Sequence, residues 1–166
     1  MAGTKKRMDD LEILDAALMW RNFSGAAGKN NAEGDRNFCV RLKPDDAVRL
    51  KEAGWNVKSK DPIDPQDDKL YWLPVKVEYA NFPPKIVLVT QKNKTPLTED
   101  KIKKLDAIEM QKVDLIINPY QWTYNGNSGV KAYLKIMYFT MKEDPLAARY
   151  ADIPDSFTSG LTDDDD

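Results

Sequence analysis

The sequence of 166 residues contains no histidine, a single cysteine and no long apolar run. Histidine is the usual general base near neutral pH, so its absence excludes the ordinary Ser-His and Cys-His mechanisms and histidine-ligated zinc. The lone Cys39 excludes an internal disulfide and a cysteine cluster. No segment approaches the ~20 apolar residues that a membrane-spanning helix needs. These absences disfavour the commonest catalytic, metal-binding and membrane classes.

Acidic residues are concentrated at the end of the chain. The net charge is −2, but the segment from Pro145 onward has six acidic residues and one arginine, so it carries −5. Residues 1–144 therefore carry +3, which is modest. The chain ends in four consecutive aspartates, Asp163, Asp164, Asp165 and Asp166. The overall charge thus hides a weakly basic body that is followed by an acidic end.

The length predicts one domain with terminal extensions. The basic N-terminus is followed by no apolar signal core, which predicts a cytosolic protein that does not enter a membrane. We expect a flexible lead over residues 1–9 and a folded domain over 10–152. Residues 153–166 are polar and acidic, with few groups that could pack, and we expect them to form a disordered tail.

Hydrophobic periodicity predicts six or seven β-strands and two short helices. One helix is expected at Asp45–Ala53, between Pro44 and Gly54, and the other from Thr98 to about Ile108. A proline inside a strand pattern, Pro74, predicts that its strand lies at an edge or contains a bulge. The strands are expected over residues 11–23, 38–43, 55–58, 71–79, 85–91, 113–124 and 130–142.

The last two predicted strands form a hairpin, because Asn-Gly followed by Asn-Ser-Gly at 125–129 is strong turn punctuation. Alternation gives the return strand two different faces, one apolar and one mixed. The first face contains Val130, Ala132, Leu134, Ile136 and Tyr138, and the second contains Lys131, Tyr133, Lys135, Met137 and Phe139.

These elements predict a mainly β fold. A five-stranded Greek-key barrel of the oligonucleotide/oligosaccharide-binding (OB) type accommodates the strands, with two short helices inserted between them. A β-sandwich is the alternative, since periodicity does not determine topology.

Aromatic side chains alternate with lysine and arginine along the predicted strands. Aromatic rings stack on nucleobases and nearby cations neutralise phosphates, so this pattern predicts a surface for single-stranded nucleic acid. Because the same pattern also fills cores, some members are expected to be buried. Tyr133 is expected to be exposed, so Tyr133→Ala should weaken binding with little loss of stability. The stacking candidates are Trp20, Phe23, Trp72, Trp122, Tyr124 and Tyr133, and the phosphate candidates are Arg21, Arg36, Arg41, Lys76, Lys131 and Lys135.

Other patterns give weaker indications. The loop Gly25-Ala26-Ala27-Gly28-Lys29-Asn30 has two residues between its glycines, whereas a nucleotide-binding P-loop has four and then Ser or Thr after the lysine. Carboxylates cluster at 9–15 and 61–68, in segments expected to be mobile or at edges, where solvated charge is a better interpretation than a two-metal site. No cofactor is indicated.

Four segments resemble a family of proteins encoded by bacteriophages and prophages. They are Trp20-Arg21-Asn22-Phe23-Ser24-Gly25, Glu33-Gly34-Asp35-Arg36-Asn37-Phe38, Gly54-Trp55-Asn56-Val57-Lys58 and Gly129-Val130-Lys131-Ala132-Tyr133-Leu134-Lys135. The resemblance extends from about Leu11 to Asp152. It implies an OB-type barrel, single-stranded DNA binding and, for a phage protein, the cytoplasm of a bacterial host.

The acidic end is similar to the tails of bacterial and phage single-stranded DNA-binding proteins. Bacterial tails finish with a hydrophobic residue that docks on partners, whereas this chain finishes with Asp163 to Asp166. The tail is expected to compete for the cationic surface or to contact replication and recombination proteins.

The sequence therefore predicts a non-catalytic, sequence-tolerant protein that coats single-stranded DNA in phage replication or recombination. The alternatives are a structural or adaptor protein of a phage, a metal-dependent nuclease, and an oligosaccharide-binding barrel. The oligomeric state is left open, although homo-oligomers are common among coating proteins.

Overall fold

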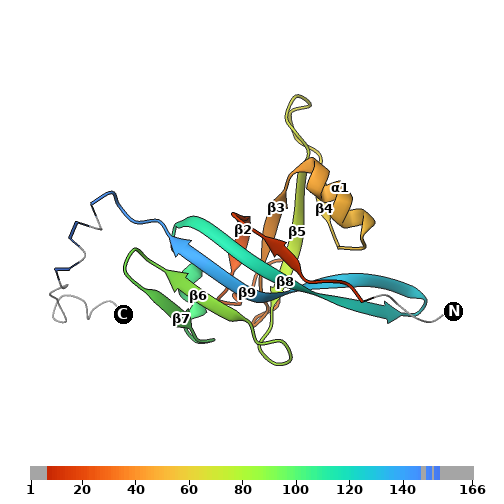
Figure 1. The fold of residues 1–166 in the computed structure, drawn as a ribbon. Coiled ribbons are helices and arrows are strands. Elements are labelled where there is room, and N and C mark those ends of the chain that lie inside the picture. Colours follow the sequence, from red (N-terminus) through yellow and green to blue (C-terminus); the bar gives the residue numbers. More distant parts are fainter. Residues whose placement is uncertain (1–6, 147–148, 151, 154–166) are drawn as a thin grey trace.

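The computed structural model describes residues 7–146, 149–150 and 152–153, and the predicted acidic tail lies outside this part except for its first residue. Over the described residues, no helix has the length and apolar character needed to cross a membrane. The elements, shown in Figure 1, are β1 (Leu11–Ile13), β2 (Ala17–Asn22), β3 (Arg36–Leu42), α1 (Pro44–Glu52), β4 (Lys58–Lys60), β5 (Leu70–Val77), β6 (Lys85–Val89), β7 (Lys94–Leu97), a 3-10 helix η1 (Ile102–Asp106), β8 (Met110–Tyr124) and β9 (Asn127–Met141).

The main path of the sheet has the strand order β1-β8-β9-β5-β3-β2. Its two end strands are consecutive in the chain and are joined by residues 14–16, so the sheet must curl back on itself. The turn is fixed to β8, because Ala16 N donates to Val113 O at 2.7 Å and Asp15 N donates to Asp114 Oδ1 at 2.8 Å. If β1 and β2 count as one bent strand, this order is a partly open five-stranded barrel, and the predicted OB-like, mainly β fold class is confirmed.

Three predicted elements differ in detail. The expected strand over residues 11–23 is interrupted, because Asp15 adopts a positive φ of 54°. The expected second helix is a single 3-10 helix, η1, so the described chain has one α-helix instead of two. The hairpin of β6 and β7 adds a strand, β7, that the hydrophobic periodicity does not predict.

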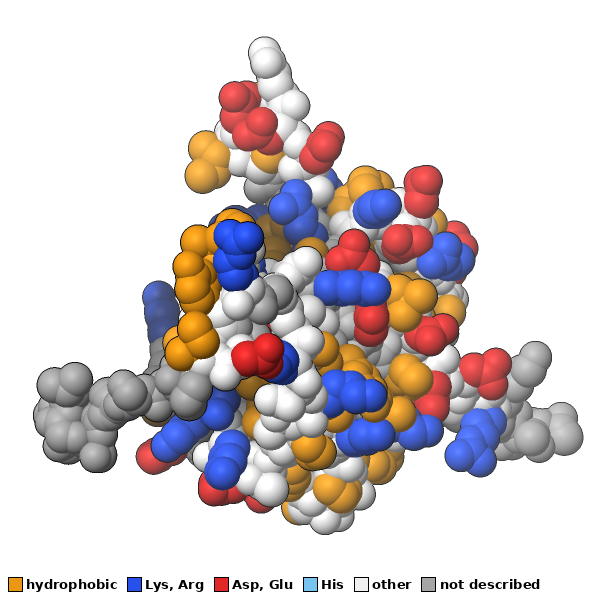
Figure 2. All heavy atoms as spheres, turned by 60° about the vertical axis from the view of Figure 1, so that its left-hand side comes forward, with side chains coloured by type: hydrophobic (Ala, Val, Ile, Leu, Met, Phe, Trp, Pro, Cys, Tyr) orange, Lys and Arg blue, Asp and Glu red, His pale blue; other side chains and the backbone are white. Residues whose placement is uncertain are grey.

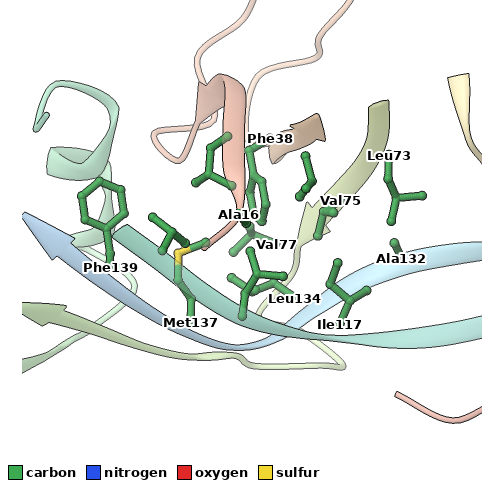
Figure 3. Packing of buried hydrophobic residues seen from close by; sticks show 14 of the residues in the cluster. Ala16, Phe38, Leu73, Val75, Val77, Ile117, Ala132, Leu134, Met137 and Phe139 are labelled. Atoms are coloured by element: carbon green, nitrogen blue, oxygen red, sulfur yellow. The ribbon is translucent and has the colours of Figure 1, made fainter. Parts of the chain in front are cut away.

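The core lies between the two halves of the curled sheet. Figure 3 shows Phe38 and Val75 projecting from β3 and β5 toward Leu134 and Ile117, which rise from β9 and β8. Ile102 and Leu105 of η1 are also completely buried, and η1 packs against β2. Interdigitated apolar side chains therefore fill the barrel and leave no lumen at its centre.

A β-bulge at Lys135 changes the predicted faces of β9. Ile116 pairs with Ile136, but the next residue, Ile117, pairs with Leu134, so β9 has one extra residue. The buried side chains are consequently Val130, Ala132 and Leu134 before the bulge, and Met137 and Phe139 after it. The strict alternation predicted over 130–142 is wrong beyond Lys135.

Pro74 does not mark an edge strand, because β5 pairs with β3 from Tyr71 to Val77. On its other side β5 pairs with β4 through residues 70–72 and with β9 through Lys76. Pro74 lies in the gap between these two partners, where no ladder hydrogen bond is required of its missing N–H.

Arg21 holds η1 against the barrel and is not available to phosphate. Its Nη1 donates to the carbonyl oxygens of Leu105 and Ile108, both at 2.7 Å, and its guanidinium lies over the Phe139 ring at 5.8 Å. Asp106 fixes the same region, accepting a hydrogen bond from Phe23 N at 2.6 Å. The prediction that Arg21 contacts phosphate is therefore corrected to a structural role.

We expect Arg21→Met to lower the free energy of unfolding by about 2 to 3 kcal/mol, because it leaves two carbonyls without their charged donor. Arg49→Met is the matched control, since Arg49 pairs with Asp46 on the exposed surface of α1 and its loss should change stability by about 0.5 kcal/mol or less. Urea denaturation of the two variants and the parent measures both effects. Equal effects of the two substitutions would contradict the structural role of Arg21.

Candidate nucleic-acid interface

The outer surface of β3, β4 and β5 carries a row of cations around a tryptophan. Trp72 of β5 pairs with Arg41 of β3 on one side and with Lys58 of β4 on the other. Directly paired residues of antiparallel strands project to the same face, so Trp72 lies between two positive side chains. Lys60, paired with Leu70, adds a third cation on this face one row away.

Trp20 completes an aromatic pair at this row. Its ring contacts the Trp72 ring edge-on, with centroids 5.1 Å apart and planes at 90°. The bulge in β2 gives Trp20 a positive φ of 51° and directs its side chain across the outer surface, where 57% of it is exposed. The two rings therefore present an open apolar platform beside Arg41 and Lys58.

A second aromatic group lies farther along the same surface. Lys76 of β5 is bridged to Tyr133 of β9, and both project outward. The Tyr133 ring stacks on Phe82 with centroids 4.8 Å apart and meets Tyr120 edge-on at 6.0 Å. Tyr133 is only 8% exposed, and its burial, reinforced by Glu78 and Tyr120, raises the pKa of its hydroxyl.

The projecting end of the β8–β9 hairpin continues this surface (Figure 1). Tyr120 pairs with Lys131, Trp122 with Gly129 and Tyr124 with Asn127, all on the outward face. The Trp122 ring lies over Gly129, where a methyl carbon added to the glycine would be 2.8 Å from Cζ2 of the ring. Gly129 therefore provides the space that lets Trp122 lie flat on the strand.

We call this continuous outer surface the aromatic face. Figure 2, turned so that the side away from the hairpin end comes forward, shows Lys, Arg, Asp and Glu side chains lying among hydrophobic ones. The aromatic face is made up of Trp20, Arg41, Lys58, Lys60, Trp72, Lys76, Phe82, Tyr120, Trp122, Tyr124, Lys131 and Tyr133.

Most of the predicted site residues lie on the aromatic face, but three of them are held elsewhere by packing or by hydrogen bonds. Phe23 is completely buried and stacks on Phe38, so it cannot stack on a base. Arg36 projects from the core face of β3, where its Nη1 pairs with Glu99 at 2.6 Å. Arg21 supports η1, as described above.

Two other predicted residues are on the outer surface but are engaged. Lys135 is the bulge residue and forms an ion pair with Asp10 at 2.7 Å. Tyr133 is packed, so we expect Tyr133→Ala to lower stability, contrary to the expectation from alternation. Lys135 and Tyr133 stay candidates for contact with DNA, but each would make that contact from a position held by its neighbours in the fold.

Sequence reasoning missed Lys58, Lys60, Phe82 and Tyr120. Lys58 and Lys60 alternate around Ser59, which places both on one side of a strand, but the strand was expected to end at residue 58. Phe82 precedes two prolines and belongs to no strand, so no periodicity identifies it. Tyr120 has the same parity as Trp122 and Tyr124, and extending that alternation would have found it.

Cys39 lies in the same outer sheet surface, between Met19 and Pro74. Burial raises the pKa of its thiol to about 11, so the thiol is protonated near neutral pH. Among the described residues, no group of three or more Cys, Asp or Glu side chains is placed to hold a metal ion. The chemistry available on this surface is therefore stacking and cationic contact.

The fold and the aromatic face define an OB-type barrel with a surface suited to extended single strands. A family model described as "Putative phage ssDNA-binding domain" matches residues 2–164. The chain belongs to this family of phage single-stranded DNA-binding proteins. The resemblance expected from the sequence is thereby confirmed, whereas no curated protein sequence matches the chain.

Solved structures share the fold at low sequence identity. The single-stranded DNA-binding protein of bacteriophage Enc34, solved in complex with ssDNA, has a TM-score of 0.52 and 9% identity, over 82% of this chain and 88% of that chain. The C-terminally truncated form of the Enc34 protein has a TM-score of 0.51 and 10% identity, over 82% and 87%. At such identity the likeness concerns the fold.

We expect Gly129→Ala to displace the Trp122 ring, because the added methyl carbon would overlap it. The indole N–H resonances of the four tryptophans report this by NMR, and the Trp122 resonance should shift most. Gly28→Ala is the control, since nothing lies within 4 Å of its added carbon and its φ is not positive. An unchanged Trp122 resonance in Gly129→Ala would contradict the inferred packing.

Proposed function

We propose that this phage single-stranded DNA-binding protein coats exposed strands in replication or recombination, without catalysis and without sequence preference. The observation that carries the proposal is the continuity of the aromatic face, which extends from the Trp20–Trp72 pair, through Lys76, to the hairpin. An extended strand needs such a path of alternating apolar platforms and cations.

Stacking provides the apolar part of the binding free energy. A base stacked on an aromatic ring contributes roughly 1–3 kcal/mol whatever its identity. Trp20 and Tyr124 are the most accessible platforms, with 57% and 71% of their surface exposed. Trp72 and Trp122 are half-buried, which fixes their ring orientation before the strand arrives. Tolerance of sequence follows because every base offers a stacking surface.

Cations provide the remainder by contacting phosphates. Arg41 and Lys58 flank Trp72 at about one strand spacing, ~4.8 Å on either side. Lys76 and Lys131 have the same relation to Tyr133 and Tyr120. A base on the ring would thus keep its neighbouring phosphates within reach of a cation, and affinity should fall as salt displaces these contacts.

In this proposal the acidic end competes with DNA for the aromatic face or recruits protein partners. Its support is the charge distribution, since Asp163 to Asp166 can be attracted to the lysines and arginine of the aromatic face. Replication or recombination proteins with basic surfaces are the partners that such a tail would contact.

Fluorescence anisotropy with labelled oligo-dT across a salt series tests the function directly. We expect the full chain to bind the single strand, to bind more weakly as salt rises, and to be displaced poorly by duplex DNA. A chain truncated after Asp152 should bind more tightly if the tail competes. Absence of binding by both chains at low salt would refute the proposal, whereas equal binding by both would refute only the competing tail.

We expect Trp20→Ala to weaken binding to oligo-dT by about 5- to 150-fold, which corresponds to the loss of one stacked base. Its melting temperature should change little because the ring is mostly exposed. Tyr150→Ala is a matched control, since Tyr150 has a similar exposure, 55%, and lies outside the aromatic face. If only the Tyr150→Ala control lost affinity, the aromatic face would not be the binding surface.

We expect Arg41→Gln to reduce the slope of log K against log salt concentration by about 0.7, the value for one phosphate contact on a single strand. Arg49→Gln removes the same charge from the exposed surface of α1 and should leave the slope unchanged. Isothermal binding curves at four or more salt concentrations separate the two variants. Identical slopes would show that Arg41 acts only through general charge.

A further inference from the structure

The outer surface of the barrel has a second apolar region, on the other side of the Lys135 bulge. The strand register places it across β8, β9, β6 and β7. Ile116 pairs with Ile136, Tyr138 pairs with Val87, and Val87 pairs with Pro96. We call this region the β6–β9 face; its apolar members are Ile116, Ile136, Tyr138, Val87, Val89 and Pro96.

These side chains lie on the surface opposite the core. Their chain neighbours Leu115, Met137 and Ile86 are buried inside the barrel. Strands that are apolar on both faces are typical of sheets that are covered on both faces. The two described helices pack mainly against other strands, α1 against β5 and η1 against β2. On the face itself Ile116, Ile136 and Tyr138 are half-buried, and Val87, at the centre, is only 3% exposed.

Charged residues line the two sides of the β6–β9 face unequally. On the β1–β8 side lie Glu12 and Asp114, with Lys112 paired to Asp114 at 3.7 Å. On the β6–β7 side lie Lys85, whose Nζ is 5.5 Å from the centroid of the Tyr138 ring, and Lys94. One side therefore carries two carboxylates against one lysine, and the other carries two lysines.

We propose that the β6–β9 face binds a second copy of this chain. A two-fold axis parallel to the strands and lying in the interface would place the acidic side of each copy over the basic side of the other. An axis perpendicular to the strands would place like charges together, so the charge pattern selects the first arrangement. The apolar centre would then be buried from both sides.

The size of the face sets the strength of this contact. Four strands about 4.8 Å apart and five residues of ~3.3 Å rise give roughly 320 Å² for each copy. This is less than half of the ~800 Å² per partner of a standard stable interface. The dimer is therefore expected to be weak and to form at micromolar or higher concentration.

Dimerisation would leave the aromatic face free. In β9, Lys131 and Tyr133 belong to the aromatic face, whereas Ile136 and Tyr138 belong to the β6–β9 face, and Lys135 separates them. Two copies joined in this way would present two aromatic faces to one DNA strand, which raises the effective concentration of the second site.

Sedimentation velocity over a series of protein concentrations, without DNA, tests the proposal independently of DNA binding. We expect the full chain to self-associate reversibly. Ile136→Asp should weaken the dimer by about tenfold or more, because it places a charge in the apolar centre. Ile63→Asp is the matched control, since Ile63 is fully exposed in the loop between β4 and β5 and should leave association unchanged.

A second variant tests the same interface without a substitution in its apolar centre, so that a folding defect cannot account for the result. Lys85→Glu combined with Lys94→Glu changes only exposed side chains and should also weaken association, while adding Glu12→Lys should restore part of it. A chain that stays monomeric throughout the series, or one whose association is unaffected by Ile136→Asp and by the lysine changes, would overturn the proposal. Circular dichroism melts confirm that each variant is folded.

Discussion

Burial of one face of a single sheet against itself is the constraint on which the structure depends. The two end strands, β1 and β2, are separated by three residues, and their turn is hydrogen-bonded to β8. The sheet therefore has to curl, and the curl turns Phe38 and Val75 toward Ile117 and Leu134. The closure also determines which side chains lie on the convex outer surface, because residues that alternate with the buried ones must point to solvent.

Strand positions and the fold class were predictable because alternation and turn residues are local signals. The mainly β class, the long hairpin and helix α1 followed from them, whereas alternation alone left both an OB-like barrel and a β-sandwich open. The bulge at Lys135 was not predictable, since an extra residue in one strand is defined only by its partner strand. The same reason explains why Met137 and Phe139 were assigned to the wrong face. The positive φ of Asp15, in the turn between β1 and β2, has no periodic signal either.

Candidate site residues were predicted less well than the fold, because residue type does not show what a side chain contacts. Trp20, Arg41, Trp72, Lys76, Trp122, Tyr124 and Lys131 lie together on the aromatic face as the alternation indicated. Arg21 and Arg36 have the same chemistry but are engaged by carbonyl groups of the η1 region and by Glu99, respectively. Such tertiary partners are 60 or more residues away in the sequence and have no local signature.

The bulge also has a consequence for how β9 can change in length. Because it lies between Leu134 and Met137, both of which are buried, it sets the phase of the strand on either side. Deleting the extra residue would remove the bulge and keep both sides in phase, because Leu134 and Met137 would then be two positions apart. A single-residue insertion or deletion elsewhere between Val130 and Phe139 would instead turn one side of the strand away from the core. Single-residue insertions and deletions in β9 away from the bulge should therefore be excluded in functional relatives, whereas changes at the hairpin tip, beyond Tyr124, shift no buried residue.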